Sequence, residues 1–361
     1  MSTANIVPET YELEGDDAMD TLRSTGSWRL VRDSYTRLRM ADGFSHGRAT
    51  AFQVVLALLP GAVVLVALAS LLDWQPLSKA IFDSIQSFAP GPAGEVFRDA
   101  FDQGREAGST SDWAAIVAGS IALLVAGTTV FGQIERTCNR VYGIERDRPT
   151  VAKYSHAFGM MLTAGTLTAM FFIALGVGGS WELGDGFWHD VWQIARWPIG
   201  ALLLTAAYTI VLQRSPRRRQ PDFSWLFVGA LVGVALAMVV SLLLHFYLGR
   251  SGSFGDTYGP IAGFLGVMLW AYGSVLGLYL GVAFAAQLEA VRASRPDPVS
   301  QAKLELGEPD AAVLSYAGAL TFSARQHDED VEEGIEERIE QGIEDEQEPV
   351  NDLDHRKVGQ P

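Results

Sequence analysis

The histidines of this chain, the side chains best suited to acid–base chemistry near neutral pH, show no pattern that supports catalysis. They are His46, His156, His189, His245, His327 and His355. Their spacing matches no zinc motif such as HExxH, and the chain has neither a Walker A sequence nor a GxSxG nucleophile elbow. The sequence therefore disfavours an enzyme and predicts no cofactor and no metal site.

Other polar side chains fall within or beside long apolar stretches, where polar groups are costly and therefore candidates for function. They are Gln53, Glu135, Arg136, Asn139 and His245. We expect Glu135 and Arg136 to satisfy neighbouring groups near the cytoplasmic end of their helix. A lone histidine such as His245 is more often hydrogen-bonded structure than a proton relay, and both interpretations stay open here.

Helices in a membrane must position these side chains, because the chain contains six long apolar stretches. The stretches are 50–72, 113–131, 157–178, 195–213, 225–248 and 261–286. Each approaches or exceeds the ~20 apolar residues that an α-helix needs to cross a bilayer. The predicted fold is all-α: a polytopic membrane protein whose bundle of six transmembrane helices occupies 49–290.

Lysine and arginine are distributed unevenly between the two sides of this bundle. The N-terminal segment and the loops after spans 2 and 4 carry 15 of them, whereas the loops after spans 1, 3 and 5 carry 5. Because cytoplasmic segments are enriched in these residues, both termini are predicted to lie in the cytoplasm. An even number of spans requires the same arrangement.

The segments outside the bundle differ in charge. Residues 1–20 hold six acidic residues and no basic one, which predicts a disordered acidic lead. Residues 21–48 mix arginines with apolar side chains and are predicted to be a cytoplasmic basic amphipathic segment, either on the inner leaflet or as plain flanking charge. Residues 291–361 are predicted to be an acidic, mostly disordered tail. An isoleucine every fourth residue in part of this tail leaves open a helix that folds on a protein partner.

The external loop between spans 1 and 2, residues 73–112, is predicted to form two short amphipathic helices, near 77–88 and 96–101. Apolar residues recur there at helical spacing on either side of Pro90-Gly91-Pro92. These helices either pack at the outer membrane interface or cover a substrate cavity as a lid.

Backbone-breaking and small residues mark three of the spans. Pro60 and Gly61 lie in the middle of span 1 and predict a kink, because proline removes an internal hydrogen bond. Glycines recur every fourth residue in spans 5 and 6, which is typical of helices that approach closely. They are Gly229 and Gly233 in span 5, and Gly273, Gly277 and Gly281 in span 6. Packing within one chain is favoured over a dimer, and the oligomeric state stays unknown.

Three regions resemble sequence patterns of the YihY/BrkB family of bacterial inner-membrane proteins, once labelled ribonuclease BN. The matching residues are Arg48-Ala49-Thr50-Ala51-Phe52 with Leu58-Leu59-Pro60, Phe131-Gly132-Gln133-Ile134 through Asn139-Arg140-Val141-Tyr142-Gly143-Ile144, and Tyr258-Gly259-Pro260 with Leu269-Trp270-Ala271-Tyr272 and Gly281. The resemblance covers about 30–290. It implies a multi-pass protein of the bacterial plasma membrane and adds Tyr258, Gly259, Trp270 and Tyr272 to the candidate residues.

One position departs from the family pattern. The family commonly has Gly-Ala-Glu-Leu late in helix 6, whereas the corresponding residues here are Gly281-Val282-Ala283-Phe284. The acidic group is therefore absent at that place, and we expect Gln287 or Glu289, about one turn later, to substitute for it.

The resemblance implies roles attached to the family, among them envelope integrity, serum resistance and transport. We expect a transport or lipid-handling role in envelope maintenance, with membrane lipids as neighbours and a lipid or small molecule as substrate. The alternative is a non-catalytic scaffold that recruits a protein partner through its acidic tail. A nuclease is disfavoured, and no nucleic-acid partner is expected, because the inner loops offer arginines without an acid–base pair.

Overall fold

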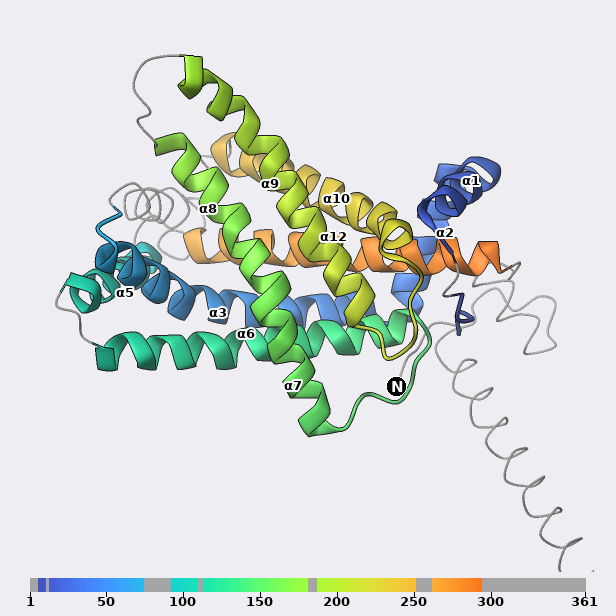
Figure 1. Cartoon of the computed structure of the whole chain (residues 1–361), viewed down its shortest axis with the longest axis horizontal. Coiled ribbons are helices and arrows are strands. Elements are labelled where there is room, and N and C mark those ends of the chain that lie inside the picture. The colour runs from blue at the N-terminus through green and yellow to red at the C-terminus, as the bar shows by residue number, and fades with distance from the viewer. Residues whose placement is uncertain are drawn as a thin grey trace, which may run out of the picture.

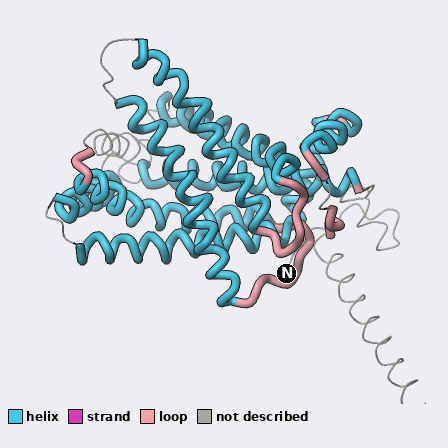
Figure 2. Tube along the Cα trace, in the orientation of Figure 1, coloured by secondary structure: helices cyan, strands magenta, loops and turns pink. Residues whose placement is uncertain are grey.

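The computed structural model describes residues 6–10, 13–74, 92–109, 113–180, 187–250 and 262–293. The described elements, in chain order, are α1 (Gly15–Thr25), α2 (Ser27–Met40), α3 (Gly43–Leu71), α5 (Pro92–Ser109), α6 (Trp113–Val141), α7 (Thr150–Met160), the π-helical turn η1 (Met161–Gly165), α8 (Thr166–Ser180), α9 (Phe187–Arg214), α10 (Phe223–Arg250) and α12 (Ala262–Arg292). Within these ranges the chain forms helices and connecting turns and no strand (Figures 1 and 2).

Within the described ranges, six spans are long and apolar enough to cross a membrane, which confirms the predicted all-α polytopic fold. They are Gly43–Leu71, Ile116–Val141, Thr150–Leu175, His189–Arg214, Phe223–Leu244 and Phe264–Arg292. The helix of the second span, α6, continues to Val141, ten residues past the end predicted at 131. This extension is polar, and the contacts described below satisfy its side chains.

The tightest helix pair is α10 with α12, and glycines form its interface. A Cβ atom placed on Gly281 would lie 2.7 Å from the carbonyl oxygen of Gly229 and 2.9 Å from the Cα of Gly233. A Cβ on Gly277 would lie 2.9 Å from the backbone nitrogen of Ala237. The two backbones thus touch where the sequence places its small residues. Four of the five glycines of these motifs, Gly229, Gly233, Gly277 and Gly281, therefore serve packing within one chain.

Three helices, α3, α6 and α12, run side by side across the view in Figure 1, and α3 contacts both of the others. Helix α5 lies against the end of α3 that precedes the first loop. A Cβ atom placed on its Gly104 would lie 2.6 Å from the carbonyl oxygen of Val63, and one placed on Gly108 would clash with the carbonyl oxygen of Ala67. This helix is one of the two amphipathic helices expected in the external loop, and the other, near 77–88, lies outside the described residues.

The third span is interrupted by η1, whose hydrogen bonds are those of a π-helix rather than an α-helix. Helix α7 contacts α6, whereas beyond η1 the span continues as α8 and packs against α9. In Figure 1 the α8–α9 hairpin crosses the α3–α6–α12 layer diagonally. The π-turn therefore lies where the span changes its packing partner.

The N-terminal region differs from the prediction of a disordered lead over 1–20. Helix α1 begins at Gly15, and Val7 and Ala18 are almost fully buried. Gly26, at a φ of 87°, connects α1 to α2. Backbone hydrogen bonds hold this region to the bundle: the Val7 amide donates to the Tyr142 carbonyl, and the Asp222 amide donates to the Leu13 carbonyl. A high density of acidic residues predicts disorder only when nothing pairs with the backbone and charges.

Candidate functional site

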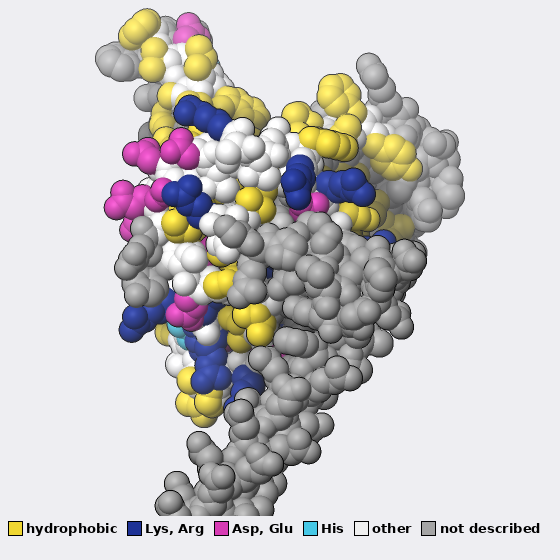
Figure 3. All heavy atoms as spheres, turned by 90° about the vertical axis from the view of Figure 1, so that its right-hand side faces the viewer, with side chains coloured by type: hydrophobic (Ala, Val, Ile, Leu, Met, Phe, Trp, Pro, Cys, Tyr) yellow, Lys and Arg dark blue, Asp and Glu magenta, His cyan; other side chains and the backbone are white. Residues whose placement is uncertain are grey.

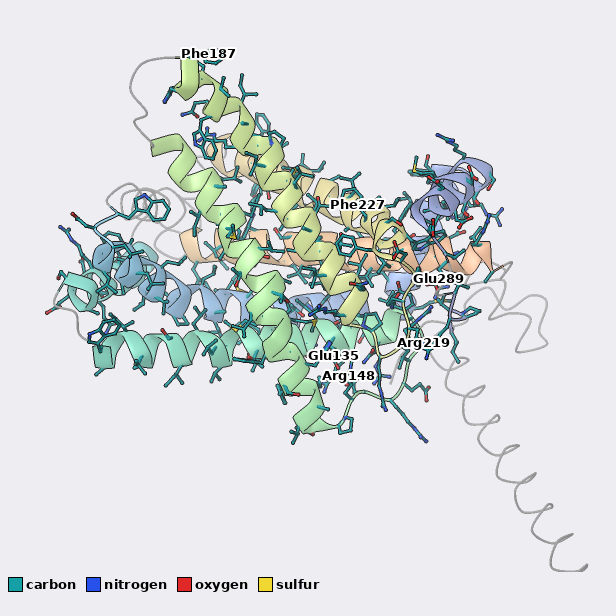
Figure 4. The ribbon with its side chains drawn as sticks, in the orientation of Figure 1. Glu135, Arg148, Phe187, Arg219, Phe227 and Glu289 are labelled. Carbon is teal, nitrogen blue, oxygen red and sulfur yellow. The ribbon has the colours of Figure 1, made fainter. Side chains whose placement is uncertain are left out.

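Polar contacts gather at one end of the bundle, which we call the polar end. It comprises residues 7–10 and 13–25, the loops 142–149 and 215–222, and the last turns of α6 and α12. Figure 3 faces this end, and Lys and Arg side chains are spread over its visible surface beside Asp and Glu. Two buried carboxylates, Glu135 and Glu289, each form an ion pair there (Figure 4).

Glu135, a residue singled out from the sequence, is fully buried in α6 and joins two further segments. Its Oε1 lies 2.9 Å from Nη1 of Arg148 in the loop 142–149, and its Oε2 lies 3.2 Å from Nδ1 of His156 in α7. Arg148 also donates to the carbonyl oxygens of Arg214, Ser215 and Pro216. One buried carboxylate thus ties together α6, α7 and, through Arg148, the loop that follows α9.

Arg136 and Asn139, the other two candidates on α6, meet at Asp147. The Asn139 side-chain amide donates to Oδ1 of Asp147 at 3.0 Å, and Arg136 Nε donates to Oδ2 at 3.2 Å. Lys153 Nζ lies 3.1 Å from the same Oδ2. The amide of Arg217 in turn donates to Oδ1 of Asn139 at 2.8 Å. The structure therefore brings Glu135, Arg136 and Asn139 into one region, where their side chains hold the neighbouring loops in position.

The electrostatics of Asp147 favour its charged form. Partial burial by itself raises the pKa of Asp147, but hydrogen bonds from Asn139 and Lys153 and the charges of Lys153 and Arg136 outweigh burial. The result is a pKa below the ordinary value. Asp147 lies between α6 and α7, outside the spans.

Replacing Asp147 with asparagine should therefore remove a pH-dependent part of the stability. A carboxylate with a lowered folded-state pKa stabilises the fold above its unfolded pKa of about 4, and this contribution is lost as the pH falls through the folded value. We expect Asp147→Asn to lower the free energy of unfolding by about 1 kcal/mol at pH 7, because the pairs are partly exposed. Thermal unfolding in detergent from pH 7 to pH 3 measures the difference.

The matched control is Glu145→Gln, an exposed acidic residue of the same loop that should change stability little. The difference between wild type and Asp147→Asn should shrink below about pH 4. A difference that stayed constant with pH would contradict the electrostatic assignment.

Glu289, near the end of α12, is the second buried carboxylate. Arg218 from the loop 215–222 pairs with its Oε1, and both the amide and the hydroxyl of Thr10 donate to the same oxygen. The Arg218 guanidinium also donates to the carbonyls of Val7 and Pro8 at 2.9 and 3.1 Å, and it stacks 4.8 Å from the ring centroid of Tyr142. This cluster, which we call the Glu289 latch, fastens the N-terminal segment to the bundle.

A second arginine supports the latch from α2. Arg37 is 1% exposed, and its Nε donates to Oε1 of Gln287 at 3.0 Å. Burial lowers the pKa of Arg37 to about 10, so it stays charged at neutral pH. Sequence reasoning offered Gln287 and Glu289 only as substitutes for a missing acid, and it did not single out Arg37, Arg218 or Thr10. Arginines outside the spans carry no sequence signal that separates a buried one from a surface one.

Within the bundle, hydroxyl and amide groups link α3, α6 and α12. The Tyr279 hydroxyl of α12 lies 2.6 Å from the Thr50 hydroxyl, and the Thr137 hydroxyl donates to it at 3.1 Å. Gln133 of α6 contacts His46 of α3 at 3.1 Å. Gln53, one turn further along α3 from Thr50, has a buried Oε1 with no hydrogen-bond partner among the described atoms.

The remaining predicted residues are dispersed. Helix α3 continues as one helix through Pro60, and a Cβ on Gly61 would meet only Leu123, at 3.6 Å. Trp270 donates from its ring nitrogen to the Ser241 hydroxyl at 3.1 Å and lies 5.9 Å from the ring of Phe172. Tyr272 packs beside Gly47, and Gly273 is covered by Val240. The side chain of His245, together with Tyr258 and Gly259, lies outside the described residues.

Within the described ranges, no three His, Cys, Asp or Glu side chains stand together as metal ligands. The ion pairs at the polar end join loops and the N-terminal segment to the helices, so these charged side chains anchor the segments to the bundle. The fold and this site define a polytopic α-helical membrane protein whose loops are fixed to the bundle by buried charges.

Comparison with known proteins gives the family. The chain belongs to the family described as virulence factor BrkB, whose model matches residues 34–304. This confirms the resemblance seen in the sequence. The acidic tail predicted to recruit a protein partner lies almost entirely beyond the match and outside the described residues.

Two relatives illustrate the breadth of the family. A UPF0761 membrane protein of Xanthomonas campestris pv. campestris (strain B100) is 26% identical over 303 residues, covering 81% of this chain and 66% of the relative. The ribonuclease-like protein YfkH of Bacillus subtilis (strain 168) is 24% identical over 282 residues, covering 74% of this chain and 98% of the relative. The chain thus spans slightly less than two thirds of the Xanthomonas protein. No solved structure matches the chain.

Proposed function

We propose that the protein handles lipids: a phospholipid or similar amphiphile enters the bundle sideways, between α8 and the α3–α6–α12 layer. The protein works in the bacterial plasma membrane, with the polar end and both termini in the cytoplasm. The excess of Lys and Arg in the segments of that end supports this orientation. Helical bundles rather than barrels are suited to this membrane.

The observation that carries the proposal is the loose attachment of the third span. Only 17% of its most apolar stretch is buried, against 56% for the sixth span, which lies at the centre of the bundle. Leu162, Met170 and Phe172 of this span expose about half of their surface, at 51%, 47% and 44%. An apolar surface of this kind is compatible with acyl chains on both of its sides.

Two features on either side of the proposed entry suit a path for an amphiphile, one in the third span and one in α3. The π-turn η1 gives the third span a point at which the α-helical hydrogen bonds change register, and such turns are frequent at functional sites. Gln53 supplies a buried polar atom in α3 for a headgroup that passes the middle of the bundle. The Phe172–Trp270 ring contact joins α8 to α12 and is the closing contact of this path.

Lipid movement in vesicles tests the proposal. Protein reconstituted with fluorescent phosphatidylglycerol should make the inner-leaflet label accessible to an external quencher faster than protein-free vesicles do. Phe172→Leu removes the ring contact, worth about 1 kcal/mol, and should speed the movement about fivefold. The control is Leu231→Ala on α10, a residue that is 52% exposed and lies ten residues before Ser241, the hydrogen-bond partner of Trp270.

Wild-type movement equal to that of empty vesicles would refute lipid handling. An equal effect of Phe172→Leu and Leu231→Ala would refute the path and leave general loosening of the bundle as the cause. Incubation of the same purified protein with RNA, with and without divalent cations, separates lipid handling from the nuclease activity suggested by the name of the Bacillus relative.

A further inference from the structure

Helix α2 presents an exposed face of aromatic, aliphatic and basic side chains. Trp28, Val31 and Tyr35 are 81%, 45% and 49% exposed. Their spacing of three and four residues aligns them along one side of the helix. Arg32 and Arg39 are exposed directly beside this stripe. The face thus combines tryptophan and tyrosine with two positive charges.

The opposite face of α2 is fixed to the bundle, so the exposed face has a defined direction. Leu30, Ser34, Arg37 and Leu38 are almost fully buried. Arg37 donates to Gln287 of α12 at 3.0 Å and to the carbonyl of Val141 of α6 at 3.4 Å. A helix anchored in this way cannot rotate to hide Trp28 without breaking buried hydrogen bonds.

The exposed face continues onto the surface of the first span. The ring of Tyr35 meets the ring of Phe44 of α3, with centroids 5.7 Å apart. Further along α3, Phe52 and Leu56 are 51% and 50% exposed, as expected for side chains that face lipid. The apolar stripe of α2 is therefore joined through Phe44 to the surface of a membrane-crossing helix.

We propose that α2 is an anionic-lipid binding element. Trp28, Val31 and Tyr35 lie among the headgroups and the first acyl carbons of the adjacent leaflet, and Arg32 and Arg39 bind phosphate groups of anionic phospholipids. Tryptophan, tyrosine and arginine are the residues that stabilise helices at this depth. The chemistry favours lipid over a protein partner, because basic residues near a membrane surface gain energy from its negative potential.

Depth measurements on a spin-labelled full-length chain test the immersion. The chain has one cysteine, Cys138, which is buried, so a Cys138→Ala background accepts a label at Val31→Cys. In nanodiscs of phosphatidylcholine and phosphatidylglycerol we expect this label to be relaxed by oxygen more than by a water-soluble nickel complex. The control label at Asp20→Cys, on the exposed acidic side of α1, should show the reverse. A label at position 31 that behaves like the one at position 20 would overturn the proposal.

Charge variants test the choice of lipid. In the double variant Arg32→Gln/Arg39→Gln we expect a loss of the preference for spin-labelled phosphatidylglycerol over phosphatidylcholine. The matched variant Arg29→Gln should retain the preference, because Arg29 pairs with Asp33 at 3.8 Å on the flank of the helix. An unchanged preference in the double variant would overturn the assignment of Arg32 and Arg39.

Deletion of 296–361 examines the acidic tail as a competing occupant of the same face. Under the proposal the label at position 31 stays immersed without the tail, and a label that is immersed only when the tail is present refutes it. These measurements need no lipid movement, so their outcome is independent of the transport test above.

Discussion

Replacing Gly281 with leucine should cause one of the largest losses of stability available to a single substitution in this chain. Already the Cβ atom would lie 2.7 Å from the Gly229 carbonyl oxygen, a rigid backbone atom that cannot move aside alone. The α10–α12 pair must then separate along its length. We expect Gly281→Ala to cost about 1–3 kcal/mol and Gly281→Leu to cost more, with loss of folded protein after extraction. Thermal unfolding and gel filtration in detergent measure both.

Gly159→Ala is the matched control for this prediction. A Cβ atom at that position of α7 meets nothing within 4 Å, so the substitution should leave stability unchanged or slightly improved. Equal melting temperatures for Gly281→Ala and Gly159→Ala would contradict the packing described for α10 and α12.

The close packing of these glycines also limits which substitutions can be used to test transport. Gly277 and Gly281 contact the backbone of α10 and do not border open space. Bulky side chains at these positions would abolish any activity by unfolding the protein, whatever the function. Phe172 is a better probe, because it is 44% exposed and contacts Trp270 at a ring edge.

The spans and their glycine interface could be predicted because hydrophobic length and small-residue spacing are local properties of the sequence. The interval of four between Gly273, Gly277 and Gly281 already indicated a close helix pair. The same spacing at Gly229 and Gly233 indicated close approach for span 5 as well, and the structure shows that these two spans are partners. No comparable local pattern marks the third span, where η1 contacts α6 and α9.

The polar end was only partly predictable. Glu135 attracted attention because it extends an apolar stretch, and its burial follows from that position. Its partner Arg148 lies 13 residues away in a loop with a second arginine, Arg146, and nothing in the sequence ranks one above the other. The first 20 residues were predicted to be disordered from their charge, yet Thr10 and Leu13 bond to segments more than 200 residues away. Such pairing is a property of the tertiary fold.

Removing one member of the Glu289 latch should destabilise the protein strongly. The Arg218 side chain is 4% exposed and that of Glu289 is 0% exposed, so either one left alone is a buried charge without its partner. We expect Glu289→Leu or Arg218→Met to lower the free energy of unfolding by about 3–5 kcal/mol. Both variants should raise hydrogen exchange in residues 6–25. Glu289→Leu removes the acceptor of the Thr10 amide, and Arg218→Met removes the donor to the carbonyls of Val7 and Pro8.

The double variant Glu289→Leu/Arg218→Met separates the ion pair from the anchoring of the N-terminal segment. With no lone charge left in the interior, its loss of stability should be smaller than the sum of the two single losses. Hydrogen exchange in 6–25 should nevertheless remain high, because the carbonyls of Val7 and Pro8 still lack the guanidinium.

Exposed Arg292, paired with Asp17 at 2.7 Å on the same two segments, supplies the control. Arg292→Ala should cost less than about 1 kcal/mol. If it releases residues 6–25 as fully as Glu289→Leu does, the surface pair rather than the buried latch holds the segment in place.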